Sequence, residues 1–528
     1  MRTRNLLTYL LLAWTATCCT SQFKDINTDK TGITDKDLEI DYNNYGIRLN
    51  IIQQGIYFNY DYGKGKNWPF QLTQNLNADM FSGYMHDAKP HNGGSHNSDY
   101  NLQDGWNSAM WGHTYAYIFP QIHQSEITTR DPYPGFFGIT KILKVEVMHR
   151  VTDYYGPVIY THFADASMNY KPDTQKDVYQ AFFNELDTAV TTLSKYISEC
   201  PQASEFSSFD ILLDGKYTSW IKFANSLRMR LAIRIAAVDP EKAEKEFIKG
   251  FQNEYGCFTS AEECVAVSTA SGYSNPLGEI NRVWNEAFMS APMESILSGY
   301  QDPRLSVYFE PCKDKQHLNE YRGIRQGTCF SHTYYSSLSK LNINSKTDAI
   351  LMTPAEIWFL RAEAALRKWT TEDPGTCYKN GIIASFQQHG IFQWEDYMSR
   401  DLPAADFQDV YDTDNNIKAR CQVSPRWIET ADKEVKLEKI ITQKWIAMFP
   451  EGCEAWAEQR RTGYPRLFPV KYNNSKNECI DSEIMIRRLN FPGSLQTENE
   501  EQYHELVKAL GGADHAGTRL WWDTGRNW

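Results

Sequence analysis

Three histidines stand at five-residue steps in a stretch of small and polar residues. They are His86, His91 and His96, and Asp87 directly follows the first of them. Imidazole and carboxylate groups are common ligands of transition metals, so the stretch could hold a metal ion. The five-residue step does not match the i, i+4 spacing that places two ligands on one helix face, and a glycine pair interrupts it. We therefore predict no metal site here.

The same stretch carries groups that suit a hydroxylated ligand. Phe81 and Tyr84 provide flat apolar faces, and His86, Asp87 and Asn92 provide donors and acceptors for hydroxyl groups. Aromatic rings supply a large contact area, and a few polar groups around them fix the orientation of a ligand. We predict that these five residues belong to an exposed recognition loop.

Other aromatic residues could complete this site. Trp68 precedes the loop, and Tyr273 or Trp284 from a later polar segment is expected to form the opposing wall. Trp106 and Trp111 follow the loop, but we expect them to begin the next helix and to pack inward. The predicted ligand-binding residues are therefore Trp68, Phe81, Tyr84, His86, Asp87, Asn92, Tyr273 and Trp284.

The composition places these residues in a globular protein that is rich in aromatic residues. The chain has 528 residues, of which 41% are hydrophobic and 23% are charged, and this excludes a wholly disordered or collagen-like chain. Acidic residues outnumber basic ones by 66 to 54, and the net charge of −12 argues against a nucleic-acid-binding protein. Aromatic residues make up 14%, which is enough for a core and for ligand-stacking surfaces.

No familiar catalytic motif is present. The sequence lacks G-x-S-x-G, H-E-x-x-H and the phosphate-binding P-loop, and we predict a binding protein rather than an enzyme. A secreted glycoside hydrolase stays an alternative, because the distance between two catalytic carboxylates cannot be read from a sequence. A purely structural surface protein is a third interpretation.

The segment from Asp412 to Asn416, which reads DTDNN, resembles the first half of a calcium-binding loop. Ile417 stands where such a loop needs glycine, and Val423 stands where it needs glutamate. We interpret the segment as an acidic turn, with a surface calcium ion as the alternative, and predict no cofactor.

The N-terminus is typical of a secreted bacterial lipoprotein. Two arginines precede an apolar stretch, Leu6–Trp14, which is too short to span a bilayer, and Cys18 and Cys19 follow it. Cys19 is the better lipid site, because Ala16 stands three residues before it and a small residue precedes it directly. Lipidation of Cys19 would anchor the protein to a membrane. An ordinary cleaved signal peptide is the alternative.

Apolar residues at three- and four-residue steps predict helices that come in pairs. Thr174 and Thr353 are expected to cap two of them, and Glu356 is expected to reach back to its cap, as in a capping box. Pairs of this length, joined by short turns, predict a mainly α fold of tetratricopeptide-like helical hairpins. The expected helices cover 136–154, 174–197, 217–238, 240–251, 353–369, 375–390, 437–448 and 453–461.

Long polar segments separate these pairs. They cover 59–104, 268–326 and 394–425. Loops of this length are usually functional, so we expect a helical scaffold that carries long irregular ligand-binding loops. We divide the chain into a signal peptide at 1–18, a lipidated tether at 19–36 and a single domain at 37–528.

Aromatic and charged residues gather between Trp445 and Arg466. One interpretation is a ligand cleft, and the other is a buried aromatic and ion-pair cluster that locks the last helical pair. Glu458 and Arg461 stand three residues apart on one helix face, which favours the buried cluster.

Several segments are similar in sequence to a known protein family. They are Phe23–Asp29 after the predicted lipid site, the helical segment Arg228–Ala236, the most specific segment Ile441–Arg466, and the C-terminal segments Arg487–Pro492 and Trp521–Asp523. Together they resemble the SusD/RagB outer-membrane lipoproteins of Bacteroidetes nutrient-uptake systems. The position of the first segment also supports Cys19 as the lipid site.

The resemblance implies a tetratricopeptide-like helical protein that is anchored to the outer leaflet of the outer membrane. It implies a partner, a SusC-type TonB-dependent β-barrel transporter, on which the protein sits as a lid. The implied function is the capture of an oligosaccharide, or in some relatives of a peptide, and its delivery to the barrel without catalysis.

Overall fold

The computed structural model describes residues 40–59, 68–91, 97–164, 171–328 and 335–528. The predicted signal peptide, the lipid site Cys19 and the tether lie outside the described residues, and so do Asn92 and His96.

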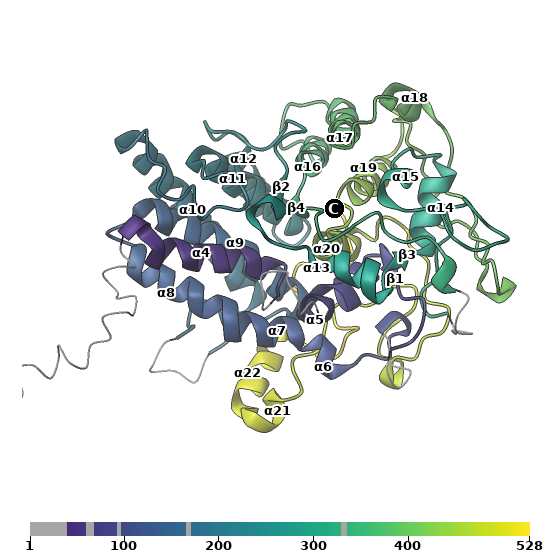
Figure 1. The fold of residues 1–528 in the computed structure, drawn as a ribbon, viewed down its shortest axis with the longest axis horizontal. Coiled ribbons are helices and arrows are strands. Elements are labelled where there is room, and N and C mark those ends of the chain that lie inside the picture. The colour runs from purple at the N-terminus through teal and green to yellow at the C-terminus, as the bar shows by residue number, and fades with distance from the viewer. Residues whose placement is uncertain (1–39, 60–67, 92–96, 165–170, 329–334) are drawn as a thin grey trace, which may run out of the picture.

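Helices stack side by side over one half of the molecule (Figure 1). Each helix of this stack packs against the next one in the sequence, which confirms the predicted hairpins. The members are α4 (Asn43–Ile56), α8 (Phe119–Thr129), α9 (Pro134–Tyr155), α10 (Gln175–Glu199), α11 (Tyr217–Arg234) and α12 (Pro240–Phe251).

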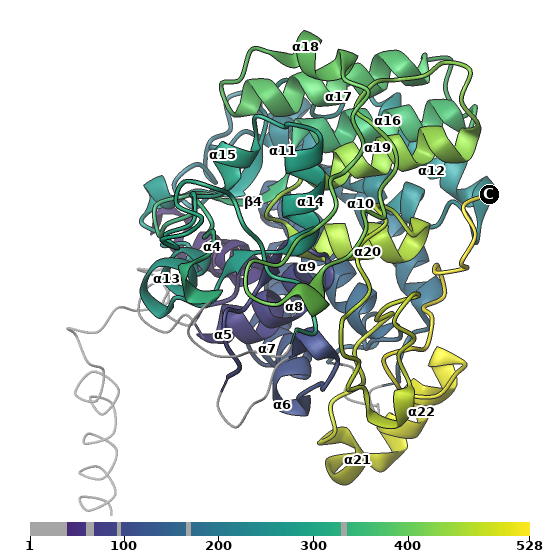
Figure 2. The same cartoon turned by 90° about the vertical axis from the view of Figure 1, so that its right-hand side faces the viewer.

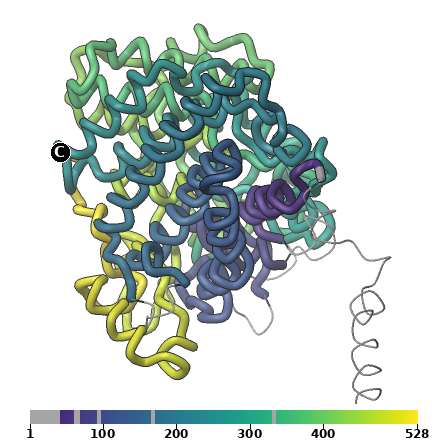
Figure 3. The backbone as a smooth tube through the Cα atoms, turned by 90° about the vertical axis from the view of Figure 1, so that its left-hand side faces the viewer, coloured from purple at the N-terminus to yellow at the C-terminus, as the bar shows by residue number. Residues whose placement is uncertain are grey.

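A second group of helices continues the stack (Figure 2). The helices α16 (Pro354–Leu366) and α17 (Pro374–Gln388) form a hairpin, and α19 (Lys433–Ala447) packs against both. The next helix, α20 (Gly452–Thr462), packs mainly against α9 and the π-helix η2 (Gln71–Asp79). The predicted last pair is therefore not a packed hairpin, because α20 turns into the core, where its charged residues find partners on α11 and α16. Figure 3 views the molecule from the side opposite to that of Figure 2 and shows α4 to α12, from purple to teal, next to one another.

The predicted caps begin their helices. Thr174 Oγ1 accepts a hydrogen bond from Asp177 N at 3.2 Å, and Thr353 Oγ1 accepts one from Glu356 N at 3.2 Å. Such a cap satisfies a backbone donor that has no partner within the helix. Glu356 does not complete a capping box, however, because both of its carboxylate oxygens accept from Arg230, each at 2.7 Å.

Short sheets and irregular segments make up the other half of the molecule. β1 (Met85–His86) pairs antiparallel with β3 (Phe288–Met289), and β2 (Val265–Val267) pairs antiparallel with β4 (Ala349–Met352). The first pairing places the 268–326 segment beside the predicted recognition loop. Short helices lie between these strands in the chain, namely α13 (Pro276–Glu279), α14 (Ala291–Gly299) and α15 (Leu305–Tyr308), whereas the short helix α18 (Trp394–Ser399) follows α17.

A set of buried ion pairs runs through the hydrophobic core, and we name it the buried charge network. Its side chains are each at most 3% exposed. Arg234 Nη1 donates to Glu458 Oε1 at 2.6 Å, and Arg461 donates to both oxygens of Glu363, at 2.7 and 2.8 Å. The network consists of Arg230, Arg234, Glu356, Glu363, Lys444, Glu454, Glu458 and Arg461.

The predicted cluster of aromatic residues and ion pairs around Glu458 is thereby confirmed, with Trp445 and Trp456 buried beside it. Of the helices in the described residues, none has both the length and the apolar character that crossing a membrane requires.

Candidate functional site

Two of the predicted stacking residues lie in the core. Phe81 is 2% exposed, and its ring centroid lies 5.2 Å from that of Trp456. Tyr84 is fully buried, and its hydroxyl donates to the backbone carbonyl of Trp445. The prediction that these rings are exposed is wrong, because α19 and α20 cover this part of the loop.

Three predicted polar or aromatic residues are also buried. His86 Nδ1 lies 2.5 Å from the backbone carbonyl oxygen of Asp87, and the carboxylate of Asp87 lies 3.4 Å from Nε2 of His91. The hydroxyl of Tyr273 donates to the backbone carbonyl of Tyr57 at 3.1 Å. The expected exposure fails for His86 and Asp87 because the pairing of β1 with β3 turns this stretch inward.

Trp68 and Trp284 reach the surface. Trp68 begins α5 (Trp68–Phe70), is 42% exposed, and lies edge-on to the ring of His113 at a centroid distance of 6.0 Å. Trp284 is partly exposed at the end of the π-helix η7 (Ile280–Trp284). In the sequence, each of the two stands within three positions of a residue that lines the recess described next.

This recess has a volume of about 400 Å³, neither Trp68 nor Trp284 lines it, and we name it the Trp106 recess. Its size lies in the range of small-ligand pockets. An aromatic face, two amides and charged groups of both signs surround it. The lining residues are Gln71, Leu72, Leu76, Lys89, Pro90, His91, Gln103, Trp106 and Glu286.

Each wall of the Trp106 recess comes from a different element. The π-helix η2 supplies Gln71, and the short helix α6 (Asp104–Asn107) supplies Trp106. The residues after β1 supply His91, and Glu286 stands two residues before β3, so the pairing of the two strands brings these walls together. Wide π-helical turns occur frequently at functional sites, and they flank this recess on η2 and η7.

Polar contacts hold the walls in place. Gln71 Nε2 donates to Glu286 Oε2 at 2.8 Å, and the rings of His91 and Trp106 meet edge to face with their centroids 5.3 Å apart. Burial alone would lower the pKa of His91, but the hydrogen bond and charge of Asp87, together with Glu286, raise it above its usual value. His91 therefore keeps its second proton to a higher pH than a free histidine.

Sequence reasoning missed several lining residues. Trp111 packs inward as predicted, at 7% exposed, but Trp106 is only partly buried, because the helix that carries it is a single turn with one face open. Gln71 stands one turn after Trp68, and this spacing is a signal that could have placed it at the site. No comparable signal marks Gln103 or Glu286.

No metal site is found in the part of the chain that the structure describes, where His, Cys, Asp and Glu side chains form no group of three or more that could hold a metal ion. The acidic turn at Asp412 uses its carboxylate locally, and Oδ1 accepts from Asp414 N at 2.9 Å. This contact caps the short turn Thr413–Asn415.

The chain matches a family model over nearly its whole length. The model describes SusD-like proteins, the SusD and RagB outer membrane lipoproteins, and it matches residues 25–523. This chain belongs to the SusD-like family. A comparison with curated proteins gives no significant match.

Solved structures of SusD homologues have the same fold. One from Bacteroides vulgatus is 45% identical, with a TM-score of 0.88, over 93% of this chain and 99% of its own. A chitin-binding homologue from Flavobacterium johnsoniae is 39% identical, with a TM-score of 0.87, over 92% of this chain and 100% of its own. A SusD-like protein from Bacteroides thetaiotaomicron is 29% identical, with a TM-score of 0.84, over 92% and 99%.

The residues that carry the SusD-like resemblance and the residues of the Trp106 recess are different. The segment Ile441–Arg466 forms α19, α20 and much of the buried charge network. The recess is built from the segment 68–106 and from Glu286, which lie within the matched residues 25–523 but outside the short segments whose sequence indicates the family. The motifs in those short segments therefore describe the helical scaffold, and the recess is formed by segments that carry none of them.

Proposed function

We propose that this SusD-like protein captures an oligosaccharide at the cell surface and delivers it to a SusC-type TonB-dependent transporter. The observation that carries the proposal is the Trp106 recess, where an aromatic face is surrounded by amide, imidazole and carboxylate groups. Sugars present apolar C–H faces ringed by hydroxyl groups, and this lining is complementary to both. The description of the Flavobacterium johnsoniae relative as chitin-binding supports a glycan ligand.

Each group in the recess has a role in this proposal. Trp106 stacks on a sugar ring, and the amides of Gln71 and Gln103 donate to and accept from hydroxyl groups. Glu286 accepts from hydroxyl groups, and its hydrogen bond from Gln71 fixes its orientation. The imidazole of His91 donates to hydroxyl groups, since its raised pKa keeps it protonated to a higher pH. We also assign Trp68 to the ligand-binding surface, because its ring is exposed and it stands three residues before Gln71.

Calorimetric titration with chitotriose, with other oligosaccharides and with short peptides tests this function. Trp106→Ala should weaken sugar binding by about 1–3 kcal/mol, the loss typical of a central aromatic contact. Trp394→Ala is the matched control, because Trp394 is also partly buried but lies on the distant helix α18 (Figure 2). Equal affinities in the two variants would move the site away from the recess.

The same titration separates the alternatives. Binding of peptides but not of sugars would identify a peptide receptor of this architecture. A trisaccharide that is recovered cleaved would indicate a glycoside hydrolase, whereas one that is recovered intact is expected of a binding protein.

The membrane anchor and the partner belong to the proposal as well. Cys19→Ala should release the protein from the membrane, while Cys18→Ala should leave it attached, and metabolic labelling with an acyl chain would follow both. A tagged protein that is extracted gently in detergent should bring a β-barrel transporter with it. Recovery of the protein alone would count against the delivery step.

A further inference from the structure

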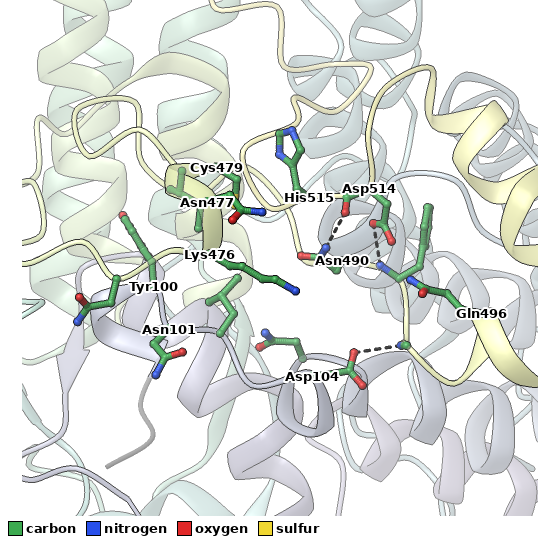
Figure 4. A pocket seen from close by; sticks show the side chains of 16 residues that line it. Tyr100, Asn101, Asp104, Lys476, Asn477, Cys479, Asn490, Gln496, Asp514 and His515 are labelled. Carbon is green, nitrogen blue, oxygen red and sulfur yellow. Dashed lines mark hydrogen bonds between the residues drawn. The ribbon is translucent and has the colours of Figure 1, made fainter. Parts of the chain in front are cut away.

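A second and larger pocket lies between residues 100–107 and the C-terminal segment 474–515 (Figure 4). Its volume is about 920 Å³. The C-terminal side carries α21 (Leu495–Glu498) and α22 (Glu500–Leu510), which project from the lower edge of the molecule in Figure 1. We name it the C-terminal pocket.

Hydrogen bonds tie the two sides of the C-terminal pocket together. The backbone N–H of Gly493 donates to Asp104 Oδ1 at 3.0 Å. The backbone N–H of Asn474 donates to the carbonyl of Asp99 at 2.8 Å, and its side-chain amide donates to Asp99 Oδ2 at 2.7 Å. A pocket whose walls are already joined in this way needs little ordering when a ligand binds.

The lining combines an apolar floor with many amides. Tyr100, Ile480 and Phe491 are each at most 2% exposed and form the floor. A primary amide offers two donors and a carbonyl acceptor, so it can match the hydroxyl groups of a sugar in either direction. Six such side chains line the pocket, namely Asn101, Asn107, Asn474, Asn477, Asn490 and Gln496.

The charges in the C-terminal pocket nearly cancel. Lys476 makes no ion pair with any described residue, and its side chain extends across the pocket towards Asn490 and Asp104 (Figure 4). The carboxylate of Asp514 is already paired with Arg488 at 2.5 Å. Of the charged lining residues, Lys476 and Asp104 therefore remain to face a ligand. Their opposite charges favour an uncharged, hydroxyl-rich molecule over a polyanion.

We infer that the C-terminal pocket is a second carbohydrate-binding site, which takes a short uncharged oligosaccharide. It is distinct from the Trp106 recess, because the segment 102–107 separates the two. Gln103 and Trp106 line the recess, whereas Asp104 and Asn107 line the pocket. The inference rests on the lining of this pocket and does not require the recess to bind the same sugar.

Protection of Lys476 from acetylation, measured by mass spectrometry on the full chain, tests the site. Cellotriose and chitotriose are the probes, because they share a linkage and differ by the acetamido group. With a sugar at ten times its dissociation constant, about one-tenth of the sites stay free, so acetylation should slow about tenfold. Lys379, an exposed lysine on α17, is the control and should react at an unchanged rate.

The same measurement in Trp106→Ala shows whether the two sites are separate. Protection of Lys476 should persist in this variant, and Lys476→Ala in the same background should weaken the residual affinity about five- to tenfold. An unprotected Lys476 with both sugars would overturn the inference. Protection that disappears in Trp106→Ala would also overturn it, because it would show one continuous site.

If the Trp106 recess does not bind sugar, the outcome is different. In that case Trp106→Ala binds sugar as tightly as the wild-type protein does, while Lys476 stays protected.

Discussion

The buried charge network and the Trp106 recess both gather cationic and carboxylate side chains, but the surroundings of these side chains differ. In the network, Arg234 and Arg461 each meet carboxylates at 2.6 to 2.9 Å, and the side chains are at most 3% exposed. In the recess, Lys89 is exposed and Glu286 is partly exposed. The same chemistry therefore holds helices together where it is buried and stays open to a ligand where it is not.

The cost of burying a charge explains this difference. A buried charge without a partner is strongly unfavourable, so each member of the network permits only those helix positions that supply its counterion. The network thereby specifies how α11, α16, α19 and α20 pack. The recess carries no such constraint, because water or a ligand can satisfy its polar groups.

The largest expected effect comes from breaking the network. Arg234→Ala leaves Glu454 and Glu458 without one of their cations and should lower the free energy of unfolding by about 3–5 kcal/mol. Chemical denaturation measures this loss. Arg420→Ala is the control, since its pair with Glu483 is exposed and should be worth less than about 1 kcal/mol. Equal losses in both variants would contradict the comparison.

A smaller loss is expected at Tyr84, which joins the loop to α19. Tyr84→Phe removes the hydroxyl that donates to the buried carbonyl of Trp445, and it should cost about 1–3 kcal/mol of stability. Sugar affinity should not change in the protein that stays folded. Tyr472→Phe is the matched control, because Tyr472 is 44% exposed and should tolerate the change. Lower affinity at unchanged melting temperature would restore Tyr84 as a ligand contact.

Trp68 should affect sugar affinity more than stability, which is the opposite of what we expect for Tyr84. Its exposed ring contributes little to the core, so Trp68→Ala should change the free energy of unfolding by less than about 0.5 kcal/mol. Affinity for the sugar should fall by about 1 kcal/mol, the lower end for an aromatic contact. Thermal unfolding and calorimetric titration give the two values. Phe392→Ala, at an exposed ring far from the recess, should change neither, and wild-type affinity in Trp68→Ala would exclude this ring from the site.

The smallest expected effect is the pH dependence that His91 gives to stability, and its sign is opposite to that of the buried charge network. Burial would raise the pKa of Glu458, but Arg461, Lys444 and Arg234 hold it well below its usual range. Its contribution to stability is therefore present above about pH 4.5 and is lost as the pH falls through the lowered pKa. The pKa of His91 is raised instead, so its contribution is present below about pH 6.5 and is lost as the pH rises.

Unfolding of the wild-type protein and of His91→Gln, compared at about pH 6 and about pH 9, tests this sign. The stability advantage of the wild-type protein should shrink towards high pH by less than about 1 kcal/mol, because the pair is partly exposed. An advantage that grows with pH would contradict the proposed role of Asp87.

The helices could be predicted from the sequence because their signals are local. The Thr174 and Thr353 caps, and the apolar spacing behind them, depend on residues within a few turns of one another. Glu356 marks where this local reasoning fails. The sequence motif predicts a capping box, but the partner of Glu356 is Arg230, which lies 126 residues away.

The candidate site was harder to predict, because burial is not a local property. Tyr84 and Trp68 are similar aromatic residues in the same polar stretch, yet one is fully buried and the other is 42% exposed. The difference arises from α19 and the following Phe449, which cover Tyr84 and leave Trp68 uncovered, and from the pairing of β1 with β3.

The sequence by itself determined the helical scaffold, the SusD-like family and the core position of Glu458 and Arg461, since spacing and motif are written along the chain. Only the tertiary structure decided which aromatic rings reach the surface. It brought Gln71, His91, Trp106 and Glu286 together from segments up to 215 residues apart. Exposure depends on what the rest of the chain packs against a residue, and no local pattern records that.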